Sequence, residues 1–525
     1  MAQKIFIKNA MVLTATSLIL RGLGLAFRVY IAGILGSEGM GLYQLVFSVY
    51  LLASTFASAG ITMAVTRVIS EQLTSLGRRG IIKIANVSIA GSVVLGLATA
   101  AVLWLISPFI GDSIVDDTRV IPALQVLSIS LPFVAANAAL RGFFMARREV
   151  AITSRSQIFE QLVKFAVVFV LVTKFSNFTM SEACIFVMAG DTLSEVGDFL
   201  YQGIGYLKVR TKIPVQGNPP LPLSKVGKKL MQIALPVAGV RYVNSILYTI
   251  ENVLVPALIG IFCASRSMAL SQWGELKGMA IPLLTFPSSF LAGFSMLLVP
   301  ELTQCCALGQ KERMQNMCMV SVHVSALLSA FGAVCFGLLY KQIGSLFYND
   351  AGVGFYLLIL APIVPSIYIE NVVDNLLKGL NQQVSTLQYS IVNSIVRIGL
   401  ILPIVPKWGM QGFLFVMIVS NIITSYLNVH RLIIVLHIKT PWVKWVVCPA
   451  AGALAAWIAG GAVQMAMLRA NMSDLPVICG VGLSAGLVYL AALYVTKNIS
   501  REELSVLTGS RKKNKSANIP SVLHK

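Results

Sequence analysis

The sequence contains few charged residues and lacks the signatures of most enzymes. Only 12% of its 525 residues are Asp, Glu, Lys or Arg, about half the share of a soluble protein. It has no Walker loop, no pair of aspartate-rich motifs for a prenyl diphosphate with Mg²⁺, and no Ser/His/Asp or Cys/His set placed to act. The four histidines have no ligand spacing, and none of the eight cysteines forms a CxxC pair. We therefore expect no enzyme activity, no metal and no cofactor.

Long apolar runs dominate what remains, because 56% of the residues are hydrophobic and the mean hydropathy is +0.79. Runs near 20 residues are long enough to cross a bilayer as helices. We expect an all-α polytopic membrane protein with no large soluble domain. Arg21 interrupts the first run and no cleavage pattern follows, so this run is predicted to be a retained span. The fourteen candidate spans lie near 10–33, 40–66, 84–107, 120–144, 153–173, 182–206, 232–258, 277–300, 317–340, 354–377, 386–405, 409–435, 445–468 and 475–496.

The basic residues predict which side of the membrane each loop occupies. If the N-terminus is cytoplasmic, 29 of the 41 Lys and Arg fall in cytoplasmic loops, tails or span ends, and only 7 fall outside. This bias predicts a cell-membrane protein with both termini in the cytoplasm. The net charge of +20 is then typical of loops that face anionic lipid, and we expect no nucleic-acid partner.

Two sets of six spans look like copies of each other. Gly60-Ile-Thr-Met matches Gly293-Phe-Ser-Met and Leu162-Val-Lys-Phe matches Ile395-Val-Arg-Ile, and the two matches have the same offset along the chain. Leu140-Arg-Gly matches Leu377-Lys-Gly at a slightly longer offset. An even number of spans makes the repeat parallel, as in transporters whose two lobes rock about a central cavity. We predict an N-lobe (1–207), a cytoplasmic linker with an interfacial helix (208–230), a C-lobe (231–437), two further spans (438–497) and a basic cytoplasmic tail (498–525).

Two arginines lie within the first span. Arg21 and Arg28 are seven residues apart, so they point to one side of a helix. One ionised arginine in hydrocarbon costs roughly 2.5–3.5 kcal/mol on insertion scales. Two on one face favour a water-filled cavity that holds something anionic. The alternative is that they snorkel to the cytoplasmic edge. Gly22, Gly24 and Gly33 keep this helix slim, which lets a neighbouring helix or a ligand approach.

Further polar residues form stripes within other spans. In span 7 the spacing predicts one polar face, in which Glu251 either neutralises its neighbours or takes a coupling proton or Na⁺; this face consists of Arg241, Asn244, Tyr248 and Glu251. In span 6 a second face carries only carboxylates, namely Asp191, Glu195 and Asp198. We interpret them first as salt-bridge partners of span 5, which carries Arg155, Glu160 and Lys164, and the alternative is a cation site. Glu370 and Asp374 of span 10 belong either to the cavity or to pairs with Arg397.

Several segments resemble a known family. Arg21-Gly-Leu-Gly-Leu-Ala-Phe-Arg with Ile34-Leu-Gly-Ser-Glu-Gly-Met-Gly-Leu-Tyr is similar to the start of the stage V sporulation protein B group. Leu140-Arg-Gly-Phe-Phe, Ala234-Leu-Pro-Val, and Ile281-Pro-Leu-Leu-Thr-Phe-Pro continuing to Leu298-Val-Pro-Glu add to the likeness. This group belongs to the polysaccharide transporter branch of the multidrug/oligosaccharidyl-lipid/polysaccharide exporter superfamily, which includes the lipid II flippase. The resemblance extends to about residue 497.

The resemblance implies transport of an undecaprenyl-diphosphate-linked sugar, such as a peptidoglycan or spore-cortex precursor, to the outer leaflet. It implies that Arg21, Arg28 and Arg241 bind the diphosphate, whereas Arg67 is displaced from the position of a further cavity arginine in the lipid II flippase. It also implies that spans 13 and 14 form a lipid-tail groove, for which the small residues of Ala450 to Gly461 are suited, as they are for simple packing. The partners are then the lipid-linked sugar, membrane lipid and a coupling H⁺ or Na⁺. The alternatives are a cation-coupled multidrug exporter and a non-transport scaffold for sporulation cell-wall synthesis.

Overall fold

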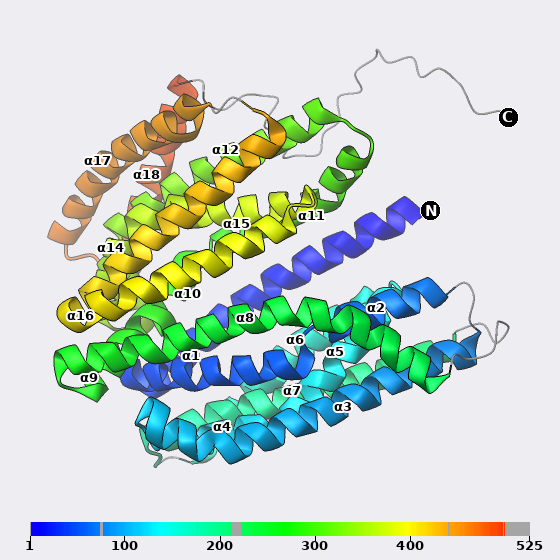
Figure 1. Ribbon diagram of the computed structural model, residues 1–525. Coiled ribbons are helices and arrows are strands. Elements are labelled where there is room, and N and C mark those ends of the chain that lie inside the picture. The colour runs from blue at the N-terminus through cyan, green and yellow to red at the C-terminus, as the bar shows by residue number, and fades with distance from the viewer. Residues whose placement is uncertain are drawn as a thin grey trace, which may run out of the picture.

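The computed structural model describes residues 2–73, 77–175, 177–212, 222–438, 441–496 and 498, with side chains from Ala15 onward except at 223 and 224. In this part of the chain every regular element is a helix (Figure 1). Residues 213–221 of the predicted linker and nearly all of the predicted tail lie outside the described residues. The elements are α1 (Ala2–Ser58), α2 (Ile61–Gln72), α3 (Arg78–Phe109), η1 (Ile110–Val115), α4 (Val120–Ser128), α5 (Leu131–Ala146), α6 (Val150–Lys174), α7 (Met180–Arg210), α8 (Leu223–Cys263), α9 (Arg266–Trp273), η2 (Gly274–Ala280), α10 (Ile281–Thr285), α11 (Ser288–Ala307), α12 (Lys311–Leu338), α13 (Tyr340–Tyr348), α14 (Ala351–Leu360), η3 (Ala361–Ile363), α15 (Val364–Gly379), α16 (Gln383–Leu436), η4 (Val443–Val447), α17 (Cys448–Arg469) and α18 (Asp474–Val495).

The two longest helices each contain a break at a glycine. Gly36 in α1 (φ 66°, ψ −175°) and Gly409 in α16 (φ 56°, ψ −139°) have backbone angles that helices do not contain, and positive φ is a conformation that glycine adopts without steric cost. Figure 1 shows that both helices turn back at these points, at the end of the molecule where α9 also lies. We call this the hairpin end.

The predicted count of fourteen spans is not confirmed. By length and composition, ten helices of the described residues can cross a membrane, or eleven if the bent pair α4 and α5 is one span. The difference has physical causes. The first two predicted spans lie in α1, and the eleventh and twelfth lie in α16. The sixth corresponds to α7, whose four carboxylates make it too polar to be counted among the ten.

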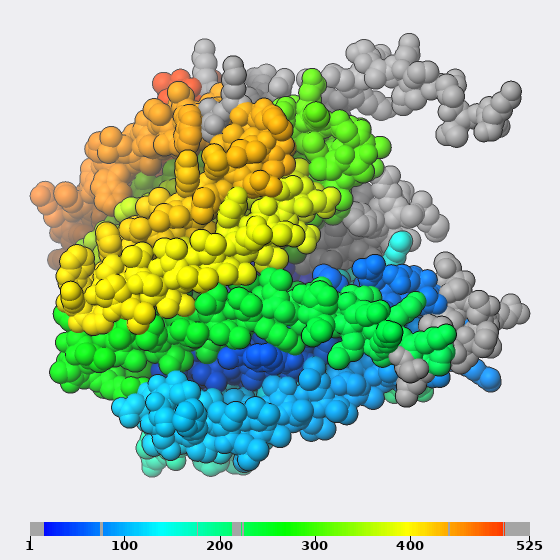
Figure 2. All heavy atoms as spheres, in the orientation of Figure 1, coloured from blue at the N-terminus to red at the C-terminus, as the bar shows by residue number. Residues whose placement is uncertain are grey.

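The helices pack so that α8 lies between the two predicted lobes. On the face shown in Figure 2, α8 forms a continuous band between α16 on one side and the N-lobe helices α1 and α3 on the other. Its contacts with the second half of α1 include Ser245 Oγ to Thr55 Oγ1 (3.2 Å) and Thr249 Oγ1 to the Ser48 carbonyl (3.0 Å). Helices α17 and α18 pack on α12, at the periphery of the C-lobe.

The lobes approach each other most closely at the hairpin end. A Cβ added to Gly41 would overlap the carbonyl oxygen of Leu270, and one added to Gly274 would overlap that of Ser37. Gly274 and Leu270 lie one repeat after Gly41 and Ser37. The same contact between a glycine and a carbonyl oxygen therefore occurs twice, once from each lobe to the other. By contrast, nothing lies within 4 Å of a Cβ at Gly22, Gly24 or Gly33. No neighbouring helix comes close to these three glycines, the space beside them is open, and the approach of a ligand there stays a prediction.

Candidate functional site

Three arginine side chains lie where the lobes meet. Arg21 of α1 crosses to the C-lobe, where its Nη1 donates a hydrogen bond to Ser289 Oγ of α11 (2.8 Å). Arg28, two turns further along α1, is half-buried and lies within electrostatic range of the Tyr248 and Tyr348 hydroxyls. Arg241 is exposed on α8. Helical spacing places these groups, because a separation of seven residues keeps Arg21 and Arg28 on one side of α1.

A pocket of about 330 Å³ separates the second half of α1 from α8. Its C-lobe wall consists of Arg241, Asn244, Ser245 and Tyr248, and its N-lobe wall of Leu51, Thr55, Ser58 and Ala59. Three of the four residues of the predicted span 7 stripe therefore line one pocket. Tyr248 lines this pocket together with Arg241 and also lies within electrostatic range of Arg28, which is not part of the lining.

These three arginines differ from the other basic residues deep in the helices. Among the described residues, no carboxylate forms an ion pair with Arg21, Arg28 or Arg241. Four other basic side chains within the bundle are all paired, namely Arg141, Lys164, Lys277 and Arg397. A guanidinium keeps its charge at all accessible pH. The three unpaired arginines therefore give the interface of the lobes a positive field with no fixed counter-charge in contact with it.

The fourth residue of the stripe, Glu251, is not part of the pocket. Its carboxylate is buried and forms ion pairs with Arg397 Nη1 of α16 (3.2 Å) and Lys277 Nζ of η2 (3.4 Å). Arg397 also donates from Nε to Ser420 Oγ (2.9 Å), and Lys277 stacks over the Trp273 ring at 5.3 Å. Of the two interpretations of Glu370 and Asp374, an ion pair with Arg397 is not seen among the described residues, and a place in the cavity stays a prediction. Lys277, counted from the sequence among the residues outside the membrane, has its ammonium group buried in this cluster.

The span 10 carboxylates have local partners instead. Glu370 accepts a hydrogen bond from Asn421 Nδ2 (3.3 Å), and Asp374 pairs with Lys378 one turn away at 2.5 Å. The Asp374 pair is half-exposed, and such a pair contributes little to stability. Arg67, the displaced arginine, pairs in the same way with Glu71 and is largely exposed.

The span 6 carboxylates form salt bridges with span 5, which is one of the two interpretations of these residues. A further base, Arg141, also takes part. Lys164 pairs with Asp191, while Arg141 of α5 binds Asp198 (2.8 Å) and Glu160 (3.7 Å). Glu195 accepts from Asn137 Nδ2 (3.1 Å). Arg155 forms no ion pair with a described residue. Sequence reasoning missed Arg141, although the repeated Leu140-Arg-Gly motif contains it and its long side chain reaches inward from the end of α5.

A polar network connects the lobes at the hairpin end. Glu38 of α1 accepts from Ser267 of α9 (2.5 Å) and from Arg119 (2.9 Å), and Ser37 is hydrogen-bonded to Ser271 at 2.6 Å. Arg119 also binds Asp117; burial raises the pKa of that carboxyl, but the hydrogen bonds from Arg119 outweigh this and leave it below its usual value. The two lobes are thus held together here by hydrogen bonds as well as by the glycine crossings.

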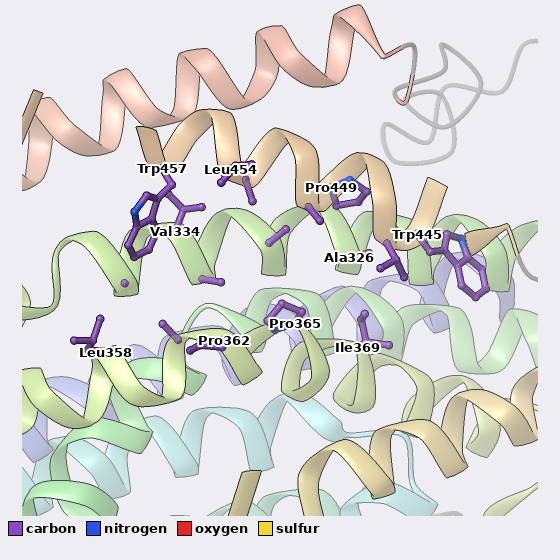
Figure 3. Close-up of a pocket in the computed structure, with 17 residues that line it drawn as sticks. Ala326, Val334, Leu358, Pro362, Pro365, Ile369, Trp445, Pro449, Leu454 and Trp457 are labelled. Carbon is purple, nitrogen blue, oxygen red and sulfur yellow. The ribbon is translucent and has the colours of Figure 1, made fainter. Parts of the chain in front are cut away.

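An apolar groove of about 500 Å³ runs between α12, α15 and α17. Figure 3 shows its walls, with Trp445 and Trp457 on the α17 side and Pro362, Pro365 and Ile369 opposite. Of the small residues predicted to matter here, Ala450 and Ala453 line the groove, whereas Gly460 packs against Leu338 and α18. The segment Ala450 to Gly461 therefore serves both close packing and the groove.

No group of three or more His, Cys, Asp or Glu side chains in the described part of the chain is arranged to hold a metal ion.

A model of the polysaccharide biosynthesis protein family matches residues 6–305. The chain belongs to this family. Stage V sporulation protein B of Bacillus subtilis (strain 168) is 24% identical over 519 residues, which is 96% of this chain and 98% of the relative. Lipid II flippase MurJ of the same organism is 23% identical over 177 residues, or 32% of each chain. The family resemblance predicted from the sequence is confirmed.

Two solved structures show the fold. Lipid II flippase MurJ in its inward closed conformation aligns with a TM-score of 0.68, covering 93% of this chain and 98% of that one at 14% identity. An inward-facing multidrug resistance MATE family transporter of the MOP superfamily gives 0.60 over 82% of this chain and 100% of that one, also at 14% identity. The prediction of an all-α, multi-pass membrane protein is confirmed.

Proposed function

We propose that this protein carries an oligosaccharide, joined to a prenyl lipid through a diphosphate, from the inner to the outer leaflet of the cell membrane. One observation carries the proposal: the guanidinium groups of Arg21, Arg28 and Arg241 lie at the lobe interface without a carboxylate partner among the described residues. A diphosphate supplies the missing negative charge. The planar guanidinium fork matches phosphate oxygens in pairs, which makes arginine the residue best suited to this group.

The apolar groove between α12, α15 and α17 suits the lipid tail. Its lining residues carry no charge, and two tryptophans border it (Figure 3). A prenyl chain can leave the polar interface and lie in this groove or in the bilayer while the headgroup crosses. The names of two relatives, stage V sporulation protein B and lipid II flippase, favour a peptidoglycan or spore-cortex precursor as the substrate.

Transport is proposed to follow alternating access, in which the two lobes rock about the interface. Two sets of contacts between the lobes would have to open in turn. At the hairpin end the lobes meet at Gly41, Gly274 and the Ser37–Ser271 hydrogen bond. Far from that end, α8 packs its Ala234 carbonyl against Gly60. If both termini are cytoplasmic, the hairpin end faces outward, and the substrate enters from the cytoplasmic side. The protein carries out no covalent step in this scheme. An ion gradient, the membrane potential or consumption of the product drives it.

The test is transport by purified protein in proteoliposomes that contain a lipid-diphosphate-linked sugar. A hydrogen bond to a charged group contributes about 1.5–3 kcal/mol, so R28A and R241A are each expected to weaken substrate binding by about 10- to 100-fold. R67A is the matched control, because Arg67 is largely exposed and already paired with Glu71. Near wild-type transport by both R28A and R241A would overturn the proposal that these arginines bind the diphosphate.

A cation-coupled multidrug exporter is the second candidate, which the excess of carboxylates in the N-lobe and the MATE-like fold favour. Unpaired arginines at the interface oppose it, since typical drug substrates are cations and would be repelled. Overexpression should then raise resistance to cationic drugs, and mass spectrometry of lipid that copurifies with the protein should find no lipid-linked sugar. The reverse pair of results supports the flippase.

A further inference from the structure

The interior of the N-lobe contains more negative than positive side chains. Two bases, Arg141 and Lys164, face four carboxylates: Glu160, Asp191, Glu195 and Asp198. Around them α5 adds Asn137, α7 adds Gln202 and α1 adds Tyr50. With every group ionised, this interior would carry two uncompensated negative charges, at a high cost within a bilayer.

The hydrogen bonds of the cluster show what it lacks. Asp198 and Gln202 are fully buried and Asn137 is 1% exposed, yet each has one side-chain oxygen with no hydrogen-bond donor. The second oxygen of Asp191 is in the same state. Gln202 Nε2 is used by Asp198 (2.8 Å) and Asn137 Nδ2 by Glu195. Arg141 Nε is a buried donor without an acceptor, against four buried oxygens without a donor. Buried acceptors without donors are rare in proteins. The cluster therefore has fewer hydrogen-bond donors than its acceptors need, and a carboxyl group that gains a proton becomes a donor.

The fold of the lobe does not need these acids. The C-lobe builds its corresponding pair of helices as α16, whose 54 residues contain no Asp or Glu. At the repeat offset that relates Leu162 to Ile395, Lys164 corresponds to Arg397 and Glu160 to Asn393. In the part of α16 after Gly409, residues such as Ser420 and Asn421 make the polar contacts. Amides and hydroxyls are thus enough for packing, and the carboxylates of the N-lobe require another explanation.

The cluster also contacts the helix that carries the arginine site. Lys164 Nζ lies over the ring of Phe27 at 4.5 Å, and Phe27 precedes Arg28 in α1. Tyr43, in the second half of α1, lies within electrostatic range of Lys164, Asp191 and Arg28 together. A change of charge in the cluster therefore acts on residues of α1 both before and after its break at Gly36.

We propose that Glu160, Glu195 and Asp198, arranged around Arg141, form a proton-binding site, and that H⁺ is the ion whose movement is coupled to transport. A proton suits this site better than a metal cation, because Arg141 already contacts Asp198 and Glu160 and would repel a second fixed cation beside it. Each proton bound removes one of the two excess negative charges and supplies a hydrogen-bond donor. The coupling rests on the proposed transport function, whereas proton binding does not.

Proton binding is tested on the full-length wild-type protein in nanodiscs without lipid-linked sugar. Infrared difference spectra recorded across a pH titration are expected to contain the carbonyl band of a protonated carboxylic acid that disappears as the pH rises. E160Q, E195Q and D198N should each reduce or shift this band, while D374N, which alters a half-exposed pair in the C-lobe, should leave it unchanged. Glu275, outside the cluster, titrates in the same range, so the band is also recorded in E275Q and only the part that remains there is assigned to the cluster. This comparison needs no substitution within the cluster, so a folding defect of the cluster variants does not prevent the test. Absence of a titrating band, or a band insensitive to all three substitutions, would overturn the site.

Coupling is tested in proteoliposomes with imposed gradients. We expect a pH gradient to change the rate of wild-type transport at least several-fold and E195Q to lose this dependence, with a Na⁺ gradient having no effect. A response to Na⁺ alone, or to neither gradient, would overturn the coupling. If the carboxyl band is present but no lipid-linked sugar moves under any condition, the proposed transport function is wrong and the proton site stands.

Discussion

The charge clusters of the two lobes are opposite in sign. In the N-lobe, Arg141 and Lys164 face four carboxylates, whereas in the C-lobe Lys277 and Arg397 share the single carboxylate of Glu251. Lys164 and Arg397 occupy corresponding positions of the repeat but choose different helices: Lys164 pairs with α7, and Arg397 with α8. Two lobes with a repeated backbone therefore carry clusters of opposite net charge with different ion-pair partners.

The difference assigns the lobes different behaviour. In the C-lobe both oxygens of Glu251 are used by Arg397 and one also by Lys277, so the carboxylate has no capacity for a transported ion. In the N-lobe, acceptors remain open. The C-lobe cluster is thus a fixed structural unit, and the N-lobe cluster is the one able to change its charge.

The largest expected effect comes from breaking the C-lobe cluster. E251Q leaves Lys277 and Arg397 buried without a counter-charge, and loss of one partner of a buried ion pair costs about 3–5 kcal/mol. The thermal midpoint in detergent should fall sharply, while E71Q, at an exposed pair, should change the free energy of unfolding by less than about 0.5 kcal/mol. Equal midpoints for E251Q and wild type would mean that the cluster is not structural.

The next effect concerns the one place where the lobes are equivalent, the glycine crossings at the hairpin end. G41A and G274A each force a methyl group against a carbonyl oxygen, and overpacking of this kind typically costs about 1–3 kcal/mol. Both should raise hydrogen exchange in α9 and in the first turns after Gly36 to a similar extent. G91A is the control, because nothing lies within 4 Å of a Cβ there. Unequal effects of the two variants would break the equivalence.

A smaller effect is expected in the N-lobe cluster, and this contrast with E251Q sharpens the comparison. E195Q removes one of the excess negative charges and keeps the volume of the side chain, so the free energy of unfolding should change by no more than about 1 kcal/mol. Measured by the same thermal unfolding, a loss as large as that of E251Q would show that Glu195 is as structural as Glu251.

The smallest effect is a pH dependence at the hairpin end. Burial, with the nearby charge of Asp350, raises the pKa of Glu275 to about 7, against a hydrogen bond from Ser271 that lowers it. A pKa raised in the closed state means that protonation of Glu275 stabilises this state relative to the open one. The closed hairpin end is therefore most stable at low pH and weakens as the pH rises from the ordinary carboxyl range to about 7. Hydrogen exchange of α9, corrected for intrinsic rates, should increase over this window in wild type and stay constant in E275Q.

Much of the architecture was predictable because a bilayer imposes strong rules. Length and apolarity located the helices, and the regular spacing along α1 placed Arg21 and Arg28 on one side. The partners of the charged groups were not predictable in the same way. Arg141 was missed because it was counted with the cytoplasmic span ends, and Lys277 because it was counted among the residues outside the membrane, although a long basic side chain can reach inward. Glu251 was not considered as a partner of Arg397, because distance along the chain says nothing about which carboxylate lies opposite.

By itself, the sequence determined that this is a helical membrane protein with arginines inside its first and seventh spans, since hydrophobic length and the fixed charge of arginine depend on residue identity alone. Only the tertiary structure decided which of its charges are satisfied. That decision depends on which helices meet: α8 meets α16 and η2, so Glu251 is neutralised, while α5, α6 and α7 bring four carboxylates to two bases. The energy of a buried charge is set by its neighbours within a few ångströms, and folding alone chooses those neighbours.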